Sequence, residues 1–98
     1  AVSILGSPKW NIEELSPEKN IGKFSKIHLL SVNAGKDEVV PAIYTRNFHI
    51  QLGRYFPDYD DRFSYVEYSN SGHFMNDKDW KLCWSRTKIW FEKHLSDV

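Results

Sequence analysis

The sequence has a single cysteine, Cys83, so no disulfide can form within the chain. Its 13 basic and 13 acidic residues balance, and neither sign forms a block of the kind that binds nucleic acid or an anionic membrane. No apolar stretch is long enough to span a membrane, and these residues contain no signal peptide. We therefore expect neither nucleic acid nor a membrane as a partner. The compartment stays undetermined, with the cytoplasm favoured.

Motifs for metals and cofactors are missing as well. The histidines and Cys83 do not have the spacing of zinc ligands. Gly35 and Lys36 suggest a phosphate-binding loop, but that loop needs a glycine where Leu30 stands and a serine or threonine where Asp37 stands. We therefore expect no metal and no cofactor.

Three of the four histidines have ordinary structural explanations. His28 lies in an apolar run and is expected to be a packed residue of a strand. His49 and His94 are expected at a helix surface and at a helix end. Cys83 is expected to be a small buried side chain inside the last helix.

Two strands stand out in the sequence. The apolar run at 27–33 does not alternate with polar residues, which is typical of a parallel strand covered on both faces. A second strand is expected at 62–68. Before them, residues 1–15 are expected to be irregular, and Ser16 with Pro17 is expected to begin a short helix.

Two longer helices are also predicted. The first is opened by Pro41 and runs to about residue 55, and Asn76 can cap the second, which runs towards the end of the chain. The aromatic residues of the second helix are expected to lie in a core. The apolar side of the first helix is expected to consist of Ile43, Phe48, Leu52 and Tyr55, with Ile50 nearby.

The order strand, helix, strand, helix indicates an α/β fold with a right-handed parallel crossover. Two parallel strands cannot bury both of their faces, and an isolated pair of strands is marginal in water. We therefore expect residues 1–98 to be the C-terminal strand-helix-strand-helix portion of a larger parallel sheet whose other strands lie elsewhere.

An acid and a histidine follow the two predicted strands. Asp37 comes after the strand at 27–33, and His73 comes after the strand at 62–68. In an open α/β sheet, ligands and catalytic groups collect beyond the carboxyl ends of the strands. Acid followed by histidine is also the order of the last two members of an α/β-hydrolase triad, whose serine comes earlier in the chain. No G-x-S-x-G elbow occurs here. The ordinary alternatives are a turn aspartate and a loop histidine.

The segment Asp37–Pro41 (DEVVP) and the pair Gly72–His73 resemble the C-terminal catalytic region of the prolyl oligopeptidase family of serine peptidases. Ser16–Pro17 with Asn20–Ile21 is similar to the serine-proline segment before the acid-bearing strand, and Trp90–Leu95 is similar to the last helix of that family. The likeness covers roughly residues 12–95.

The resemblance implies that Asp37 is the triad acid and His73 the triad base. It also implies hydrolysis of peptide bonds, or of related esters and amides, and an upstream propeller domain that restricts substrates to short peptides. The chain departs from many relatives at Asn33–Ala34, where they have His-Gly at the end of the acid-bearing strand.

We expect the chain to be the C-terminal segment of a serine hydrolase, inactive alone because the nucleophilic serine lies upstream. Its partners would be a peptide or ester substrate and the remainder of the catalytic domain. The alternatives are a carboxylesterase of the same fold, and a non-catalytic interaction module that pairs its open sheet edge with a partner or with itself. If the triad assignment is correct, the Asp37 carboxylate should approach the His73 imidazole to roughly 2.6–3.2 Å.

Overall fold

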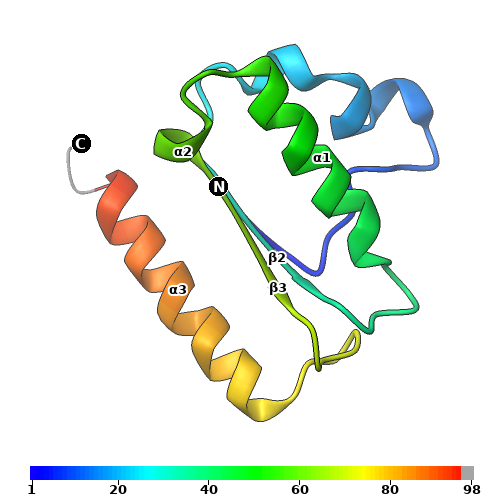
Figure 1. Cartoon of the computed structure of the whole chain (residues 1–98), viewed down its shortest axis with the longest axis vertical. Coiled ribbons are helices and arrows are strands. Elements are labelled where there is room, and N and C mark those ends of the chain that lie inside the picture. Colours follow the sequence, from blue (N-terminus) through cyan, green and yellow to red (C-terminus); the bar gives the residue numbers. More distant parts are fainter. Residues whose placement is uncertain (96–98) are drawn as a thin grey trace.

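A computed structural model describes residues 1–95 of the chain. Its centre is a three-stranded parallel sheet of order β1–β2–β3, formed by β1 (Val2–Ile4), β2 (Leu29–Ala34) and β3 (Phe63–Tyr68). Helices cover both faces of this sheet (Figure 1). The fold is therefore of the α/β class, and β2 and β3 are adjacent and parallel as the sequence predicted, with Ser31 beside Tyr65.

β1 corrects the expectation that residues 1–15 are irregular. Its three residues pair with Leu30–Val32 of β2. Further hydrogen bonds extend the pairing at both ends, from Leu30 N–H to the Ala1 carbonyl (3.0 Å) and from Leu5 N–H to the Val32 carbonyl (2.8 Å). A strand of three residues is too short to show an alternating pattern in the sequence, so its only signal is the neighbouring strand with which it pairs.

The connection from β1 to β2 contains three short 3₁₀ turns, at Glu13–Leu15, Pro17–Lys19 and Ile21–Phe24. Pro17 opens the second of them, in the place where one short helix was expected. Ser16 does not cap this turn with its side chain. Its buried hydroxyl oxygen instead accepts a hydrogen bond from the Trp10 N–H at 2.7 Å, which holds the preceding loop.

α1 (Ala42–Tyr55) packs on one face of the sheet and ends close to where the sequence predicted. The expected apolar side was only half right, because Phe48 and Leu52 are buried whereas Ile43, Ile50 and Tyr55 are exposed. Polar residues make up the rest of the buried side of α1, and a prediction from the spacing of apolar residues does not detect them. The buried residues of α1 are Ala42, Thr45, Phe48, His49 and Leu52. A short helix, α2 (Tyr59–Arg62), then leads into β3.

α3 (Asp77–Leu95) lies on the opposite face, and its start matches the predicted cap, since Asn76 Oδ1 accepts the Asp79 N–H at 2.9 Å. Cys83 is fully buried against the sheet, as expected. The expectation that the aromatic residues are core holds only in part. Trp80 and Trp90 pack against the core, but Trp84 is 60% exposed.

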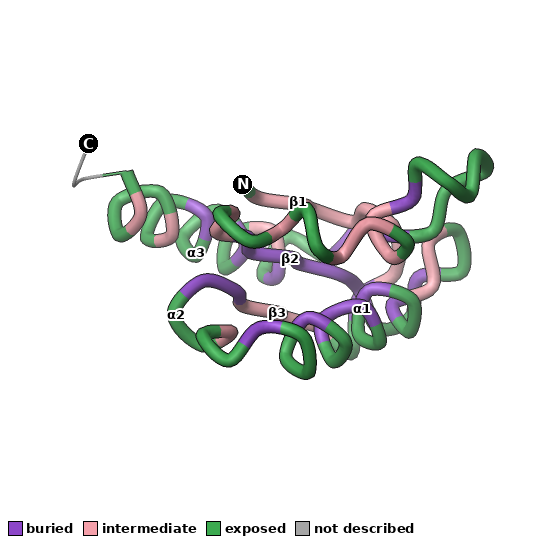
Figure 2. The backbone as a smooth tube through the Cα atoms, turned by 90° about the horizontal axis from the view of Figure 1, so that it is seen from above, coloured by how far each residue is buried: buried purple, intermediate pink, exposed green. Residues whose placement is uncertain are grey.

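β2 is buried along its whole length (Figure 2), and an apolar cluster lies on each of its faces. His28 lies just before this strand rather than within it, with its ring 4.4 Å from that of His94 near the end of α3. None of the helices in residues 1–95 is both long and apolar enough to cross a membrane. The buried cluster on the α1 face consists of Leu29, Phe48, Leu52, Phe56 and Phe63, and that on the α3 face of Leu30, Val32, Ala34, Met75 and Cys83.

Candidate active site

Asp37 lies in the loop that joins the carboxyl end of β2 to α1. Its Oδ1 atom accepts the backbone N–H groups of Val39 and Val40, each at 2.8 Å. This is the local turn bonding for which aspartate is favoured, and it fixes the carboxylate against its own loop. The Asp37 side chain is 0% exposed, so the loop holds a carboxylate away from solvent.

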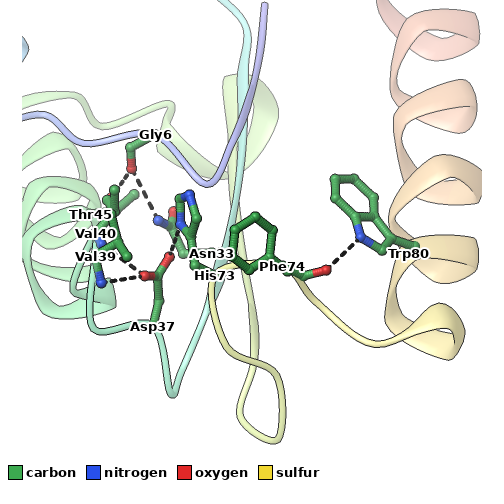
Figure 3. A network of polar contacts seen from close by, with 9 residues as sticks. All are labelled: Gly6, Asn33, Asp37, Val39, Val40, Thr45, His73, Phe74 and Trp80. Carbon is green, nitrogen blue, oxygen red and sulfur yellow. Dashed lines mark hydrogen bonds and ion pairs between the residues drawn. The ribbon is translucent and has the colours of Figure 1, made fainter.

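His73 comes from the loop after β3 and meets Asp37 from the neighbouring strand. Its Nδ1 atom lies 2.8 Å from Asp37 Oδ2 (Figure 3). This distance lies within the range expected from the sequence. An ionised carboxylate can only accept hydrogen bonds, so Nδ1 carries the proton and the lone pair of the neutral ring is on Nε2. The His73 side chain is 29% exposed, so solvent contacts the histidine of this pair but not the aspartate.

The electrostatics of Asp37 favour its ionised form. Burial alone would raise the pKa of this carboxyl group. Hydrogen bonds from the Val40 N–H, from the His73 ring and from the Val39 N–H oppose burial, and the net effect is a pKa below the usual value. Asp37 is therefore a carboxylate at neutral pH, which is the form that can orient a histidine.

Backbone hydrogen bonds join the two loops directly. The Gly35 N–H donates to the Tyr68 carbonyl and the Lys36 N–H donates to the Ser71 carbonyl, both at 2.9 Å. A Cβ atom on Gly35 would lie 2.8 Å from the Ser69 Cα atom, closer than such atoms approach in proteins. Glycine at this position therefore permits the close contact that places Asp37 beside His73.

The histidine loop is also tied to the start of α3. Ser71, two residues before His73, is buried, and its hydroxyl group donates to Asp79 Oδ2 at 2.5 Å. The same oxygen of Ser71 accepts the Asn76 N–H at 3.2 Å. The sequence predicts Asp79 in the first turn of the helix that Asn76 caps, but not its contact with the histidine loop.

Asn33 and Thr45 connect the site to the turn after β1. Both donate to the Gly6 carbonyl, Asn33 through Nδ2 at 3.1 Å and Thr45 through its hydroxyl at 3.2 Å (Figure 3). Asn33 is fully buried, and its Oδ1 atom has no hydrogen-bond partner among the described residues. The position that departs from the prolyl oligopeptidase pattern is thus a structural link between β1, β2 and α1.

A hydrolytic site also needs a nucleophile, and none contacts His73 in residues 1–95. The only hydrogen bond of the His73 side chain there is the one to Asp37. A second serine–histidine contact exists, between Ser31 and His49, but the other ring nitrogen of His49 faces the Tyr59 hydroxyl rather than an acid. The described part of the chain also contains no cluster of three acidic, histidine or cysteine side chains that could hold a metal ion.

A cavity of about 330 Å³ borders the acid-bearing loop. Val39 and Val40, whose N–H groups hold Asp37, form one wall, and Trp10 and Tyr44 form others. The cavity is open and mixed in polarity, and it is lined by residues of the acid-bearing loop but by neither Asp37 nor His73.

Comparison of the chain with family models, with curated proteins and with solved structures gives no match. The geometry of the Asp37–His73 pair is therefore the basis on which a function can be argued.

Proposed function

We propose that this chain supplies the acid and the histidine of a Ser-Asp-His triad in a serine hydrolase, most similar to a peptidase of the prolyl oligopeptidase family. The single observation that carries the proposal is the 2.8 Å contact between Asp37 and His73, made beyond the carboxyl ends of two adjacent parallel strands. This is the place where an α/β-hydrolase sheet holds these two residues, in the same chain order.

In this mechanism His73 Nε2 removes the proton from a serine hydroxyl, and the serine oxygen attacks the acyl carbon of the substrate. His73 then donates that proton to the leaving group, and water repeats the sequence to release the acid. Asp37 holds the ring in the tautomer with Nδ1–H and stabilises the imidazolium that forms. The buried, ionised state of Asp37 supports this role.

The serine and the oxyanion donors would come from the remainder of the catalytic domain. Two observations support a larger sheet. His73 Nε2 has no partner among residues 1–95, and the outer edge of β1 is unpaired within the sheet that these residues form. In an α/β-hydrolase the serine elbow follows a strand that comes earlier in the chain than the acid and the histidine. Such a strand would extend the sheet beside β1.

The substrate class is proposed as peptides or related esters and amides. The cavity at the acid-bearing loop supports this, because Trp10, Val39 and Tyr44 form the apolar part of a space of mixed polarity that could hold a substrate side chain. A carboxylesterase would use the same pair of residues. The two activities differ in the leaving group, because an amide requires protonation by His73 whereas an activated ester requires it much less.

A second candidate is a non-catalytic interaction module derived from a hydrolase. The observation that favours it is the exposed apolar surface of α3, where Trp84 stacks on Trp80 with ring centroids 6.0 Å apart and Ile89 is exposed. Together with the open edge of β1, this surface could bind a partner chain or a second copy of this one.

The experiment is to assay the complete polypeptide that contains this sequence with an activated ester and with a short peptide amide. We expect His73→Ala to abolish most turnover of both substrates, and Asp37→Asn to reduce it by roughly 10⁴-fold. The chain by itself should show no turnover that depends on His73, because it lacks the nucleophile.

His28→Ala is the matched control, because His28 precedes β2 and so lies at the opposite end of the sheet from His73. It should leave turnover close to that of the unmodified protein. Near-normal turnover in His73→Ala would overturn the catalytic assignment. Loss of amide hydrolysis with retention of ester hydrolysis in that variant would keep the triad but favour the esterase.

A further inference from the structure

A second cavity, of about 340 Å³, lies on the α1 face of the sheet and does not include the Asp37–His73 pair. The segment between β1 and β2 passes along the same side of the sheet as α1 (Figure 1), and the cavity lies between them. Trp10 and Phe24 from that segment and Phe48 from α1 provide aromatic walls. The strands contribute Ser3 of β1 with Leu29 and Ser31 of β2.

The lining of this cavity has hydroxyl groups but no charged side chain. The Ser31 hydroxyl is fixed in position by a short hydrogen bond, because its oxygen lies 2.7 Å from Nε2 of the buried His49. The other ring nitrogen of His49 lies 2.9 Å from the Tyr59 hydroxyl. A serine hydroxyl can make three hydrogen bonds and His49 uses one, so Ser31 keeps hydrogen-bonding capacity for a molecule in the cavity.

The walls and the volume define the kind of molecule that fits. Small-molecule sites begin at about 300 Å³ and are mostly apolar with a few fixed polar groups. This cavity is therefore large enough for a single aromatic ring. A charged ligand would lose its hydration without finding a counter-charge, which selects for a neutral one.

We propose that the cavity between α1 and the segment after β1 binds a small neutral aromatic molecule that carries a hydroxyl group, a phenol, with its hydroxyl on Ser31. The ring lies among Trp10, Phe24 and Phe48, and the hydroxyl exchanges a hydrogen bond with the Ser31 oxygen. The site does not use Asp37 or His73, so the proposal does not rest on the triad, although Trp10 also borders the cavity at the acid-bearing loop.

The test is a titration of the chain with 4-methylphenol and with toluene, which has the same ring and methyl group but no hydroxyl, followed by ¹H–¹⁵N NMR. We expect saturable shifts centred on Ser31, Thr45 and Phe48. 4-Methylphenol should bind roughly two- to tenfold more tightly than toluene, which corresponds to one neutral hydrogen bond.

Three variants make the test specific. Ser3→Phe places a ring in the cavity from the edge strand β1 and should remove binding of both molecules. Ser64→Phe is the matched control, because Ser64 is on the other edge strand, β3, outside the cavity, and binding should persist. Ser31→Ala should reduce the preference for 4-methylphenol over toluene to about one.

The proposal is overturned if shifts do not saturate below the solubility limit of 4-methylphenol while the spectrum stays that of a folded protein. It is also overturned if binding is the same in Ser3→Phe, or if the shifts centre on the exposed surface of α3 around Trp84. Asp37→Asn should not change binding of 4-methylphenol. Failure of this proposal can therefore be distinguished from failure of the proposed hydrolase function.

Discussion

One carboxylate oxygen of Asp37 lies 2.8 Å from Nδ1 of His73, while the other accepts the N–H groups of Val39 and Val40. Every one of these neighbours is a donor. The carboxylate therefore cannot rotate without losing hydrogen bonds, and the imidazole must present Nδ1–H to it. This relationship links the fold of one loop to the protonation of a residue on the next strand.

The first prediction follows from replacing this carboxylate with an amide, in Asp37→Asn. The amide oxygen must still face the Val39 and Val40 N–H groups, so its NH₂ group faces His73. Nδ1 then becomes an acceptor, and the proton of the neutral ring moves to Nε2. Two-bond ¹H–¹⁵N correlation spectra of the His73 ring should show the change of tautomer.

The same spectra contain their own control, because the tautomer of His28 should not change in Asp37→Asn. An His73 ring that keeps Nδ1–H in the variant would mean that the loop, and not the carboxylate, sets the protonation of His73. The positioning role of Asp37 would then be lost from the proposed mechanism.

The second prediction concerns the contact between the two loops. Gly35→Ala would place a methyl group 2.8 Å from the Ser69 Cα atom, so the loops must separate. We expect a loss of about 1–3 kcal/mol in the free energy of unfolding, the usual cost of overpacking. Urea denaturation monitored by circular dichroism measures it.

Gly72→Ala is the control, because a Cβ atom there meets only the Lys36 carbonyl oxygen at 3.8 Å, an ordinary contact. No glycine in the described chain has a positive φ, so alanine is not strained at this position. Gly72→Ala should therefore stay within about 0.5 kcal/mol of the unmodified protein or stabilise it slightly. Equal losses in the two variants would contradict the steric argument.

The third prediction concerns Arg62, which holds the amino end of the sheet together. Its Nη1 atom donates to the carbonyl oxygens of Phe24 (2.7 Å) and Ile27 (3.0 Å), and its guanidinium lies against the rings of both Phe56 and Phe63. Lysine cannot reproduce this planar arrangement. Arg62→Lys should therefore lower the free energy of unfolding by about 1–3 kcal/mol, because the buried guanidinium loses its hydrogen bonds to these partly buried carbonyl groups.

The comparison for this variant is Arg54→Lys, since Arg54 lies on an exposed part of α1. It should change the free energy of unfolding by less than about 0.5 kcal/mol in the same urea experiment. A similar loss in both variants would show that the buried hydrogen bonds of Arg62 contribute nothing specific.

The meeting of Asp37 and His73 could be predicted from the sequence because it depends on topology. Two parallel strands must have their carboxyl ends at one edge of the sheet, so any residue directly after β2 lies near a residue directly after β3. The helix between them was equally clear, because α1 is long and is opened by a proline. Whether the pair is catalytic is a separate question that the assay decides.

The features that could not be predicted depend on contacts between distant segments. The three residues of β1 carry no pattern of their own and become a strand only beside Leu30–Val32. His49 was placed on the surface of its helix, yet it is buried because Ser31 on β2 and Tyr59 beyond the helix satisfy both of its ring nitrogens. Neither partner is visible from the spacing of residues within the helix.

His49 leads to the last prediction, because a neutral buried histidine makes stability depend on pH. Burial lowers its pKa from the ordinary 6.5 to about 4, and the residue as a whole is only 4% exposed. Between these two values the unfolded chain binds a proton at His49 and the folded chain does not. The free energy of unfolding should therefore fall as the pH decreases from 6.5 towards 4, and this contribution should level off below 4.

The size and the specificity of this effect can be measured with His49→Gln, which keeps hydrogen-bonding groups at the site but does not titrate. Urea denaturation of both proteins at several pH values between 4 and 7.5 gives the difference in their free energies of unfolding, in which the contributions of the other histidines cancel. That difference should change by about 3 kcal/mol across the interval, since each unit of pKa shift corresponds to about 1.4 kcal/mol. The unmodified protein should lose stability relative to His49→Gln as the pH decreases. A difference that does not vary with pH would mean that His49 takes up a proton equally readily in the folded chain. Its hydrogen bonds to Ser31 and Tyr59 would then not be those of a neutral ring.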